Sequence, residues 1–88
     1  MAKEQSELRQ ELDSVAIQIQ EGQQWCHYKH PELFYTILGV AVIEATEQVA
    51  VIYKSDYGEG IVWIRPIYEF LGQVEVDGNT VSRFKLVN

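Results

Sequence analysis

The apolar residues of this chain change their spacing at Gly22, and this change limits the folds that the sequence can adopt. Before Gly22 they stand four, three and four positions apart, at Leu8, Leu12, Val15 and Ile19. This spacing places them on one side of an α-helix. After Gly22, short segments rich in Val, Ile, Tyr and Trp are typical of β-strands. The sequence therefore predicts an amphipathic helix within residues 1–21 and a mainly β domain at residues 22–88.

Three strands are predicted in the first part of the β domain, at residues 35–43, 48–54 and 61–65. Polar residues around Thr46 and the run at 56–60 separate them as turns. Connections this short favour antiparallel neighbours. Pro66 cannot donate to a sheet, so the third strand is expected to end there, before one short helical turn at 67–71.

A tight hairpin is predicted near the end of the chain. Asp77-Gly78 stands between the alternating segments 74–76 and 79–81, and the glycine supplies the positive φ that such a turn requires. Five short strands separated by turns predict a small antiparallel barrel or sandwich.

Size and charge exclude several classes of protein. The chain has 88 residues, which indicates one domain, and its 13 acidic against 7 basic residues give a net charge of −6. This charge has the wrong sign for binding duplex DNA. The longest apolar run, at 37–43, is far shorter than the about 20 residues of a membrane helix, and the polar start does not resemble a signal peptide. We expect a cytoplasmic protein, and the lone Cys26 agrees with a reducing compartment.

Five ordered blocks resemble the DUF1653 family of small bacterial domains, with its tyrosine-rich opening, central WVRP and closing VPRF. They are HYK at 27–29, LGVA at 38–41, WIRP at 63–66, VEVDG at 74–78 and VSRF at 81–84. The resemblance covers residues 22–86 and implies an SH3-like β-barrel, while the family brings no established activity. Cys26, His30 and Ser82 depart from the basic residue, glycine and proline of the pattern.

The strand at 61–65 is the first candidate for a contact surface. Because side chains alternate along a strand, Val62 and Ile64 point one way while Trp63 and Arg65 point the other. If Val62 and Ile64 fill the barrel, Trp63 and Arg65 lie together on the outside, and both residue types are frequent in binding hot spots. The alternative is that Trp63 belongs to the core and Arg65 pairs with Glu69.

We expect a non-catalytic interaction module that binds a protein or peptide, as an SH3-like aromatic groove does. The residues assigned to its contact surface are Trp25, Tyr28, Tyr57, Trp63, Arg65 and Tyr68. The alternative is a module for single-stranded RNA or nucleotides, with bases stacked on these aromatics. Its positive charges would be Lys29, Lys54, Arg65, Arg83 and Lys85. The net negative charge weighs against this alternative.

No catalytic, metal or cofactor site is expected. Cys26, His27 and His30 are too few for a structural zinc site, which takes four ligands. Adjacent residues of a strand point to opposite faces, so Cys26 and His27 are badly placed to share a proton. A small enzyme that uses them remains the third alternative. The N-terminal helix is expected to pack on its own domain, with homodimerisation or docking on a partner as the other outcomes.

Overall fold

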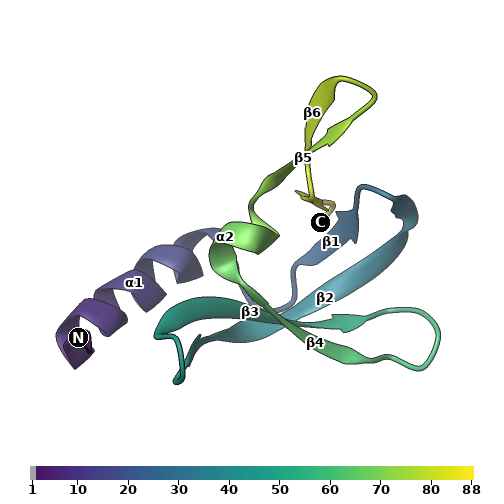
Figure 1. The fold of residues 1–88 in the computed structure, drawn as a ribbon. Helices are drawn as coiled ribbons and strands as arrows, with labels where there is room; N and C mark the ends of the chain where they lie inside the picture. The colour runs from purple at the N-terminus through teal and green to yellow at the C-terminus, as the bar shows by residue number, and fades with distance from the viewer. Residues whose placement is uncertain (1) are drawn as a thin grey trace.

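The computed structural model describes residues 2–88 as a mainly β domain with an N-terminal helix (Figure 1). The elements are α1 (Gln5–Gln18), β1 (Gln24–His27), β2 (His30–Ile43), β3 (Gln48–Ser55), β4 (Val62–Pro66), α2 (Ile67–Phe70), β5 (Gln73–Val76), β6 (Asn79–Ser82) and β7 (Phe84–Leu86). All strand pairs are antiparallel, so the predicted fold class is confirmed.

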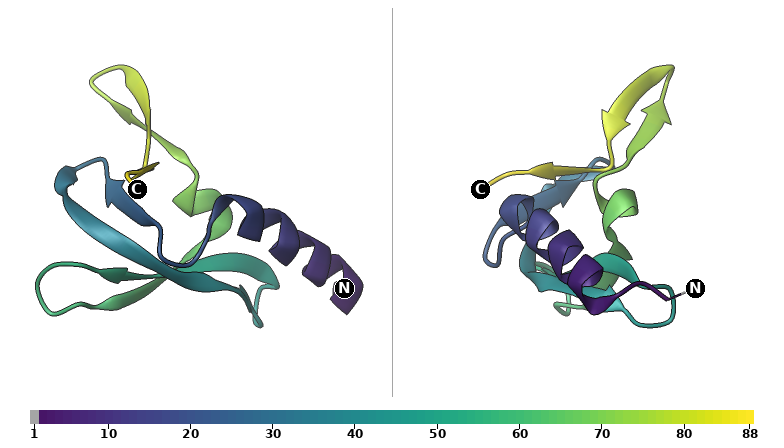
Figure 2. Two further views of the ribbon diagram at one scale, coloured as in Figure 1. Left: turned by 180° about the vertical axis from the view of Figure 1, so that it is seen from behind. Right: turned by 90° about the vertical axis from the view of Figure 1, so that its left-hand side faces the viewer.

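Five strands form one curved sheet in the order β4-β3-β2-β1-β7. The β5–β6 hairpin is a separate two-stranded sheet that projects from the body of the domain (Figures 1 and 2). Strands β4 and β7 lie at the two edges, and within residues 2–88 no strand pairing joins them. The sheet therefore has a free edge along β4.

The predicted Asp-Gly hairpin is confirmed. Asp77 and Gly78 both have positive φ, 51° and 81°, as a type I′ turn requires. The strands β1 and β7 are additional to the five predicted ones, and β2 begins at His30, before the predicted start at residue 35. The short segments at β1 and β7 become strands because they pair with each other, and β1 also pairs with β2. That reason lies in tertiary pairing and not in local sequence.

The core lies on the concave side of the sheet and is mostly aromatic. Its buried members are Ile19, Trp25, Ile37, Val51, Tyr53, Phe70 and Phe84. The short helix α2 follows Pro66 and places Phe70 over the sheet, where its ring stacks on that of Phe84 with centroids 4.3 Å apart. The predicted helical turn thus covers the core.

The helix α1 packs on its own domain, where it contacts β2 and β3 (Figure 2). Ile19 follows its C-terminal end and is buried in the core, and Val15 packs against the same cluster. At the other end, the backbone N–H of Lys3 donates to Oε1 of Glu47 at 3.0 Å. The apolar side of the helix therefore faces the sheet, as the spacing predicts.

Deleting residues 1–21 is expected to lower the free energy of unfolding by about 2 kcal/mol or more, because burial of one isoleucine alone contributes about 1.5–3 kcal/mol. Urea unfolding measures this loss. As a matched pair, Ile19→Ala should cost about 2–4 kcal/mol. Ile17→Ala should change stability by less than about 0.5 kcal/mol because Ile17 is 75% exposed. Equal stability of the truncated and full chains would show that α1 does not support the domain.

Candidate functional site

The two faces of β4 are the reverse of the expected ones. Trp63 stands opposite Tyr53, and Arg65 stands opposite Val51. Tyr53 and Val51 are core residues, so Trp63 and Arg65 lie on the concave, core-facing side. Val62 and Ile64 lie on the outer face, and the expectation that they fill the barrel is wrong. The physical reason is the register with β3, which a single strand does not reveal.

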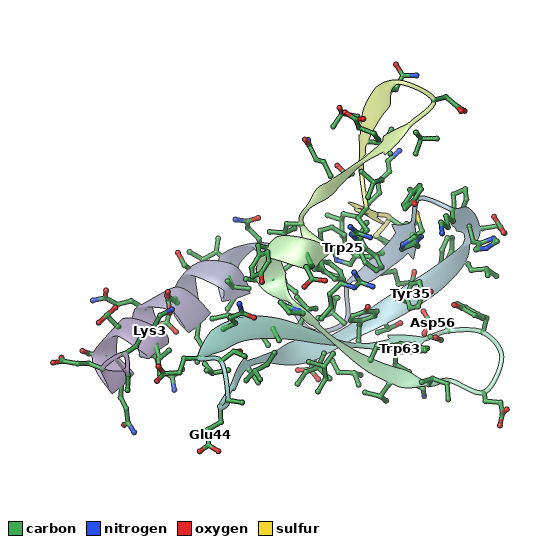
Figure 3. All side chains as sticks on the ribbon, viewed as in Figure 1. Lys3, Trp25, Tyr35, Glu44, Asp56 and Trp63 are labelled. Carbon is green, nitrogen blue, oxygen red and sulfur yellow. The ribbon has the colours of Figure 1, made fainter. Side chains whose placement is uncertain are left out.

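Trp63 nevertheless remains 46% exposed, because β4 is an edge strand with no neighbour to cover it. Its indole N–H donates to Oγ of the buried Ser55 at 2.9 Å. Ser55 stands opposite Tyr35 on β2, whose hydroxyl shares a 2.6 Å hydrogen bond with that of Tyr57. Figure 3 shows Tyr35 and Trp63 on neighbouring parts of the sheet. We call the residues Tyr35, Tyr57, Trp63 and Arg65 the Trp63 surface.

Arg65 extends this surface towards β7. Its guanidinium carbon lies 5.7 Å from the centre of the Phe84 ring, a cation–π distance. One guanidinium nitrogen lies 3.6 Å from Oε1 of Glu69, so the expected pairing with Glu69 is confirmed. Partly exposed pairs of this kind are worth about 0–1 kcal/mol, which leaves Arg65 able to exchange Glu69 for another carboxylate.

Tyr35 is the centre of the aromatic contacts at this site. Its ring lies 5.4–5.9 Å from the rings of Tyr53, Tyr57 and Phe84 in edge-to-face arrangements. Burial raises the pKa of Tyr35 well above its ordinary value, and the hydrogen bond with Tyr57 raises it further. The hydroxyl of Tyr35 therefore stays protonated, and either hydroxyl can donate in the hydrogen bond that it shares with Tyr57.

Three of the six residues assigned from sequence lie elsewhere. Trp25 is only 7% exposed, packs edge-on against Phe70 and belongs to the core, so its assignment to the contact surface is wrong. Tyr28 lies in the β1–β2 turn with its ring 4.6 Å from that of His27. Tyr68 accepts a hydrogen bond from Gln48, at the end of β3 opposite to Ser55. Gln48 lies about 16 Å along β3 from Tyr53, the residue opposite Trp63, so Tyr68 and Trp63 are separated. Arg65, opposite Val51, lies between them.

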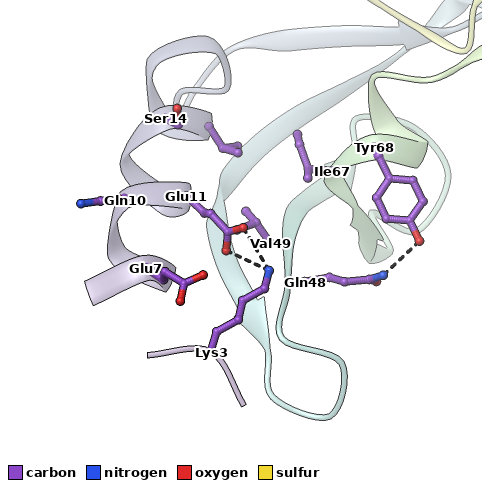
Figure 4. Close-up of a pocket in the computed structure, with 10 residues that line it drawn as sticks. Lys3, Glu7, Gln10, Glu11, Ser14, Gln48, Val49, Ile67 and Tyr68 are labelled. Atoms are coloured by element: carbon purple, nitrogen blue, oxygen red, sulfur yellow. Dashed lines mark hydrogen bonds and ion pairs between the residues drawn. The ribbon is translucent and has the colours of Figure 1, made fainter. Parts of the chain in front are cut away.

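A shallow groove of about 690 Å³ runs beside Tyr68, between α1 and β3 (Figure 4). Its floor is apolar and includes Val15, Val49 and Ile67. The wall formed by α1 carries acidic residues, and Glu11 pairs with Lys3 at 3.0 Å. The groove is thus partly filled by contacts that hold α1 in place, and nothing in it converges on a common point.

Cys26 and His27 point to opposite faces of the sheet, as expected. Cys26 is buried opposite Phe34, whereas His27 stands opposite the core residue Phe84. Nδ1 of His27 accepts a hydrogen bond from the backbone N–H of Lys29 at 3.2 Å. Within residues 2–88, no three His, Cys, Asp or Glu side chains gather as a metal site. The geometry gives no thiol–imidazole pair.

Positive charge surrounds His27 although the chain as a whole is acidic. Burial lowers the pKa of His27 below its ordinary value, and four neighbouring charges lower it further. In order of effect, these are Arg65, Arg83, Lys29 and His30. His27 thus marks a local basic region on the concave side, next to the Trp63 surface.

The stability of the domain is expected to fall on acidification in a manner that depends on His27. The unfolded chain protonates this residue near pH 6.5, whereas the folded chain does so only at lower pH. Between the two pKa values the unfolded state binds more protons, so stability decreases as the pH falls below about 6.5. Urea unfolding at a series of pH values should show a weaker decrease in His27→Gln. The matched variant His30→Gln should keep the wild-type dependence, and an unchanged curve for His27→Gln would contradict the prediction.

Two residues near the site, Tyr35 and Ser55, were not assigned from sequence. Tyr35 begins a predicted strand and Ser55 directly follows another, but only the register between β2 and β3 brings them together. His27 was named only for the alternative of a small enzyme, and Arg83 only for the nucleic-acid alternative. An alternation of Val49, Val51, Tyr53 and Ser55 along β3 was the available signal, because it continues the core-facing row to Ser55.

The backbone of β4 also contributes to the site. The N–H of Ser55 donates to the carbonyl of Ile61 at 2.9 Å, so these two residues form a hydrogen-bonded pair of the β3–β4 ladder. Hydrogen-bonded and non-hydrogen-bonded pairs alternate along an antiparallel ladder. Backbone groups of Trp63 and Arg65 then point towards β3, and those of Val62 and Ile64 point to the free edge. Ile64 is itself 63% exposed.

Comparison with known proteins identifies the region that carries this site. Residues 23–86 match the model of a family described as "Protein of unknown function (DUF1653)". The chain belongs to the DUF1653 family. The DUF1653 region includes β1 to β7 and the whole Trp63 surface, and α1 lies outside it. No curated protein and no solved structure matched the chain. Within residues 2–88, no helix is long and apolar enough to cross a membrane.

Proposed function

We propose that this DUF1653 protein is a non-catalytic module that binds an extended peptide segment of another protein at the edge strand β4. The observation that carries the proposal is the exposure of Trp63, beside the half-buried Arg65, on the core-facing side of a strand with a free edge. Tryptophan and arginine are the residue types most often found as binding hot spots.

An added strand fits the chemistry of this edge. The outward N–H and C=O groups of Val62 and Ile64 offer hydrogen bonds to a peptide backbone, as in β-strand addition. Alternate side chains of the peptide then face the concave side, where Trp63, Tyr57 and Arg65 provide aromatic area and a cation. Charged residues and proline are the common protection of edge strands, and β4 carries them only at its end, as Arg65 and Pro66, which leaves residues 61–64 without such groups.

Selection from a library of random linear peptides tests the proposal. Wild-type protein should enrich peptides that the Trp63→Ala/Arg65→Ala variant does not hold, and those peptides should protect the amides of Val62 and Ile64 from hydrogen exchange. The Lys85→Gln variant is the control for loss of a positive charge, since Lys85 pairs with Cys26 on the outer face. Equal enrichment by wild type and the double variant would contradict the proposal.

The same preparation distinguishes the nucleic-acid alternative. Single-stranded RNA bound through phosphates would lose affinity steeply with salt, whereas a peptide held by backbone hydrogen bonds and aromatic contacts should respond weakly. Steeply salt-dependent RNA binding that depends on Trp63, together with no selected peptide, would replace the peptide proposal.

A further inference from the structure

We propose that the basic region beside the Trp63 surface is an anion site, formed by Arg65, Arg83 and His27 around the Phe84 ring, that binds a carboxylate of an acidic peptide. This inference rests on the proposed peptide-binding function and names the chemical class of the peptide.

Two of the three side chains meet one aromatic ring, and the third, Arg83, lies close enough to His27 to lower the pKa of its imidazole. Arg65 lies over the ring of Phe84 at 5.7 Å, and the imidazole of His27 meets the same ring edge-on with centroids 5.1 Å apart. Arg83 directly precedes Phe84, and its position is fixed by two backbone hydrogen bonds. Its N–H donates to the carbonyl of Gly72 at 2.9 Å, and its carbonyl accepts from the N–H of Tyr28 at 2.9 Å. The cations are thus held by the rigid frame of the sheet.

One of these groups, Arg83, has a donor without an acceptor. Nε of Arg83 is buried and has no hydrogen-bond partner among residues 2–88. A buried donor of this kind costs free energy unless a ligand or solvent satisfies it. No carboxylate of the described chain lies within 4.0 Å of the charged nitrogens of Arg83, and Glu69 is the one acidic partner of Arg65. Arg83 is therefore the cation of this site without an acidic partner among residues 2–88, while Arg65 has Glu69.

His27 supplies a third donor directed by its own hydrogen bond. Because Nδ1 accepts from the N–H of Lys29, the proton of the neutral ring is on Nε2. The hydroxyls of Tyr35 and Tyr57 share one hydrogen bond, which leaves one hydroxyl proton free at the adjoining Trp63 surface. Every group here can donate to an oxyanion, and guanidinium groups match the planar carboxylate best.

The charge distribution favours a short acidic peptide over a polyanion. The net charge of −6 opposes a long phosphate backbone, which must lie against much of the surface. A single carboxylate meets only the local positive charge, since more distant charges are screened beyond about 8–10 Å at physiological salt. The adjoining aromatic surface and the free β4 edge are suited to the peptide that carries this carboxylate.

Titration of the protein with sodium acetate, followed by NMR of the arginine Nε–H groups and the His27 ring, tests the inference. With ionic strength held constant by chloride, acetate should shift the Arg83 Nε–H resonance in a saturable manner and raise the pKa of His27. The Arg83→Gln variant should bind acetate at least about tenfold more weakly, which is equivalent to about 1.4 kcal/mol. Lys85→Gln removes the same charge two residues away and should bind as wild type does. If Arg83→Gln does not fold, Arg65→Gln provides the same comparison through the His27 ring.

Three results of these experiments would overturn the anion site. A linear, non-saturable shift, or an equal response in wild type and Arg83→Gln, would show that no anion site exists. Saturable binding of inorganic phosphate without binding of acetate would assign the site to phosphate and not to a carboxylate. Failure of the peptide function is distinguishable, because acetate would then bind while no peptide is selected. Selected peptides without acidic residues, together with no acetate binding, would instead overturn the anion site alone.

Discussion

The Phe70→Ala variant is expected to lose about 3–5 kcal/mol of its free energy of unfolding, as truncation of a buried phenylalanine usually does. Phe70 has no exposed surface and contacts the rings of Trp25, Tyr53 and Phe84. Small domains have total stabilities of about 5–15 kcal/mol, so this loss leaves a marginally folded protein. Urea unfolding followed by far-ultraviolet circular dichroism measures it.

The control for Phe70→Ala is an aromatic truncation on the same short helix. Tyr68 is 59% exposed, and its hydroxyl only accepts a hydrogen bond from the side chain of Gln48. Tyr68→Ala should therefore change stability by less than about 1 kcal/mol. Unfolding of the two variants at the same urea concentration would show that Phe70 does not cover the core.

The periodicity of apolar residues was sufficient to predict the classes and most positions of the elements. The helical spacing before Gly22 predicts α1, and the strands β3, β4 and the β5–β6 hairpin follow from local composition and turn residues. These features depend on neighbours in sequence, so they are readable from one chain. Membership of the DUF1653 family was predicted from five short blocks and is confirmed over residues 23–86.

The orientation of β4 could not be predicted from sequence, because alternation defines two faces without saying which one is buried. On an edge strand this ambiguity is greatest. Here Val62 and Ile64 are more exposed than Trp63, contrary to the usual order of burial. The pairing of Trp63 with Tyr53 decides the question, and that pairing depends on the turn between β3 and β4.

The basic region was missed for a related reason. His27, Arg65 and Arg83 come from three distant parts of the chain, and the sequence alone does not show that they lie together. Only the order β1-β7, with His27 opposite Phe84, brings the first and the last together. Trp25 shows the opposite error, since its aromatic ring is a structural group of the core whose indole N–H is satisfied by Gln23.

Trp63→Ala is expected to weaken the binding of a selected peptide by about 2–4 kcal/mol, more than about thirtyfold in dissociation constant, because truncated hot-spot tryptophans have effects of this size. The fold should persist. Trp63 is half exposed at a sheet edge, and its loss leaves one hydroxyl, that of Ser55, without its donor at a cost of about 1 kcal/mol. Isothermal titration calorimetry measures the affinity, and urea unfolding of the same samples measures the stability.

Tyr68→Ala is the matched variant that separates the two exposed aromatic regions of this domain. It removes an aromatic ring beside the groove under α1, at the opposite end of β3 from Ser55, and should leave the affinity for the peptide unchanged. The reverse result, with binding lost in Tyr68→Ala and kept in Trp63→Ala, would move the binding site to the groove. Loss of binding together with unfolding of Trp63→Ala would instead make Trp63 a structural residue. We expect loss of binding without unfolding, because a half-exposed side chain at a free edge contributes little to the core but can contribute most of its area to a partner.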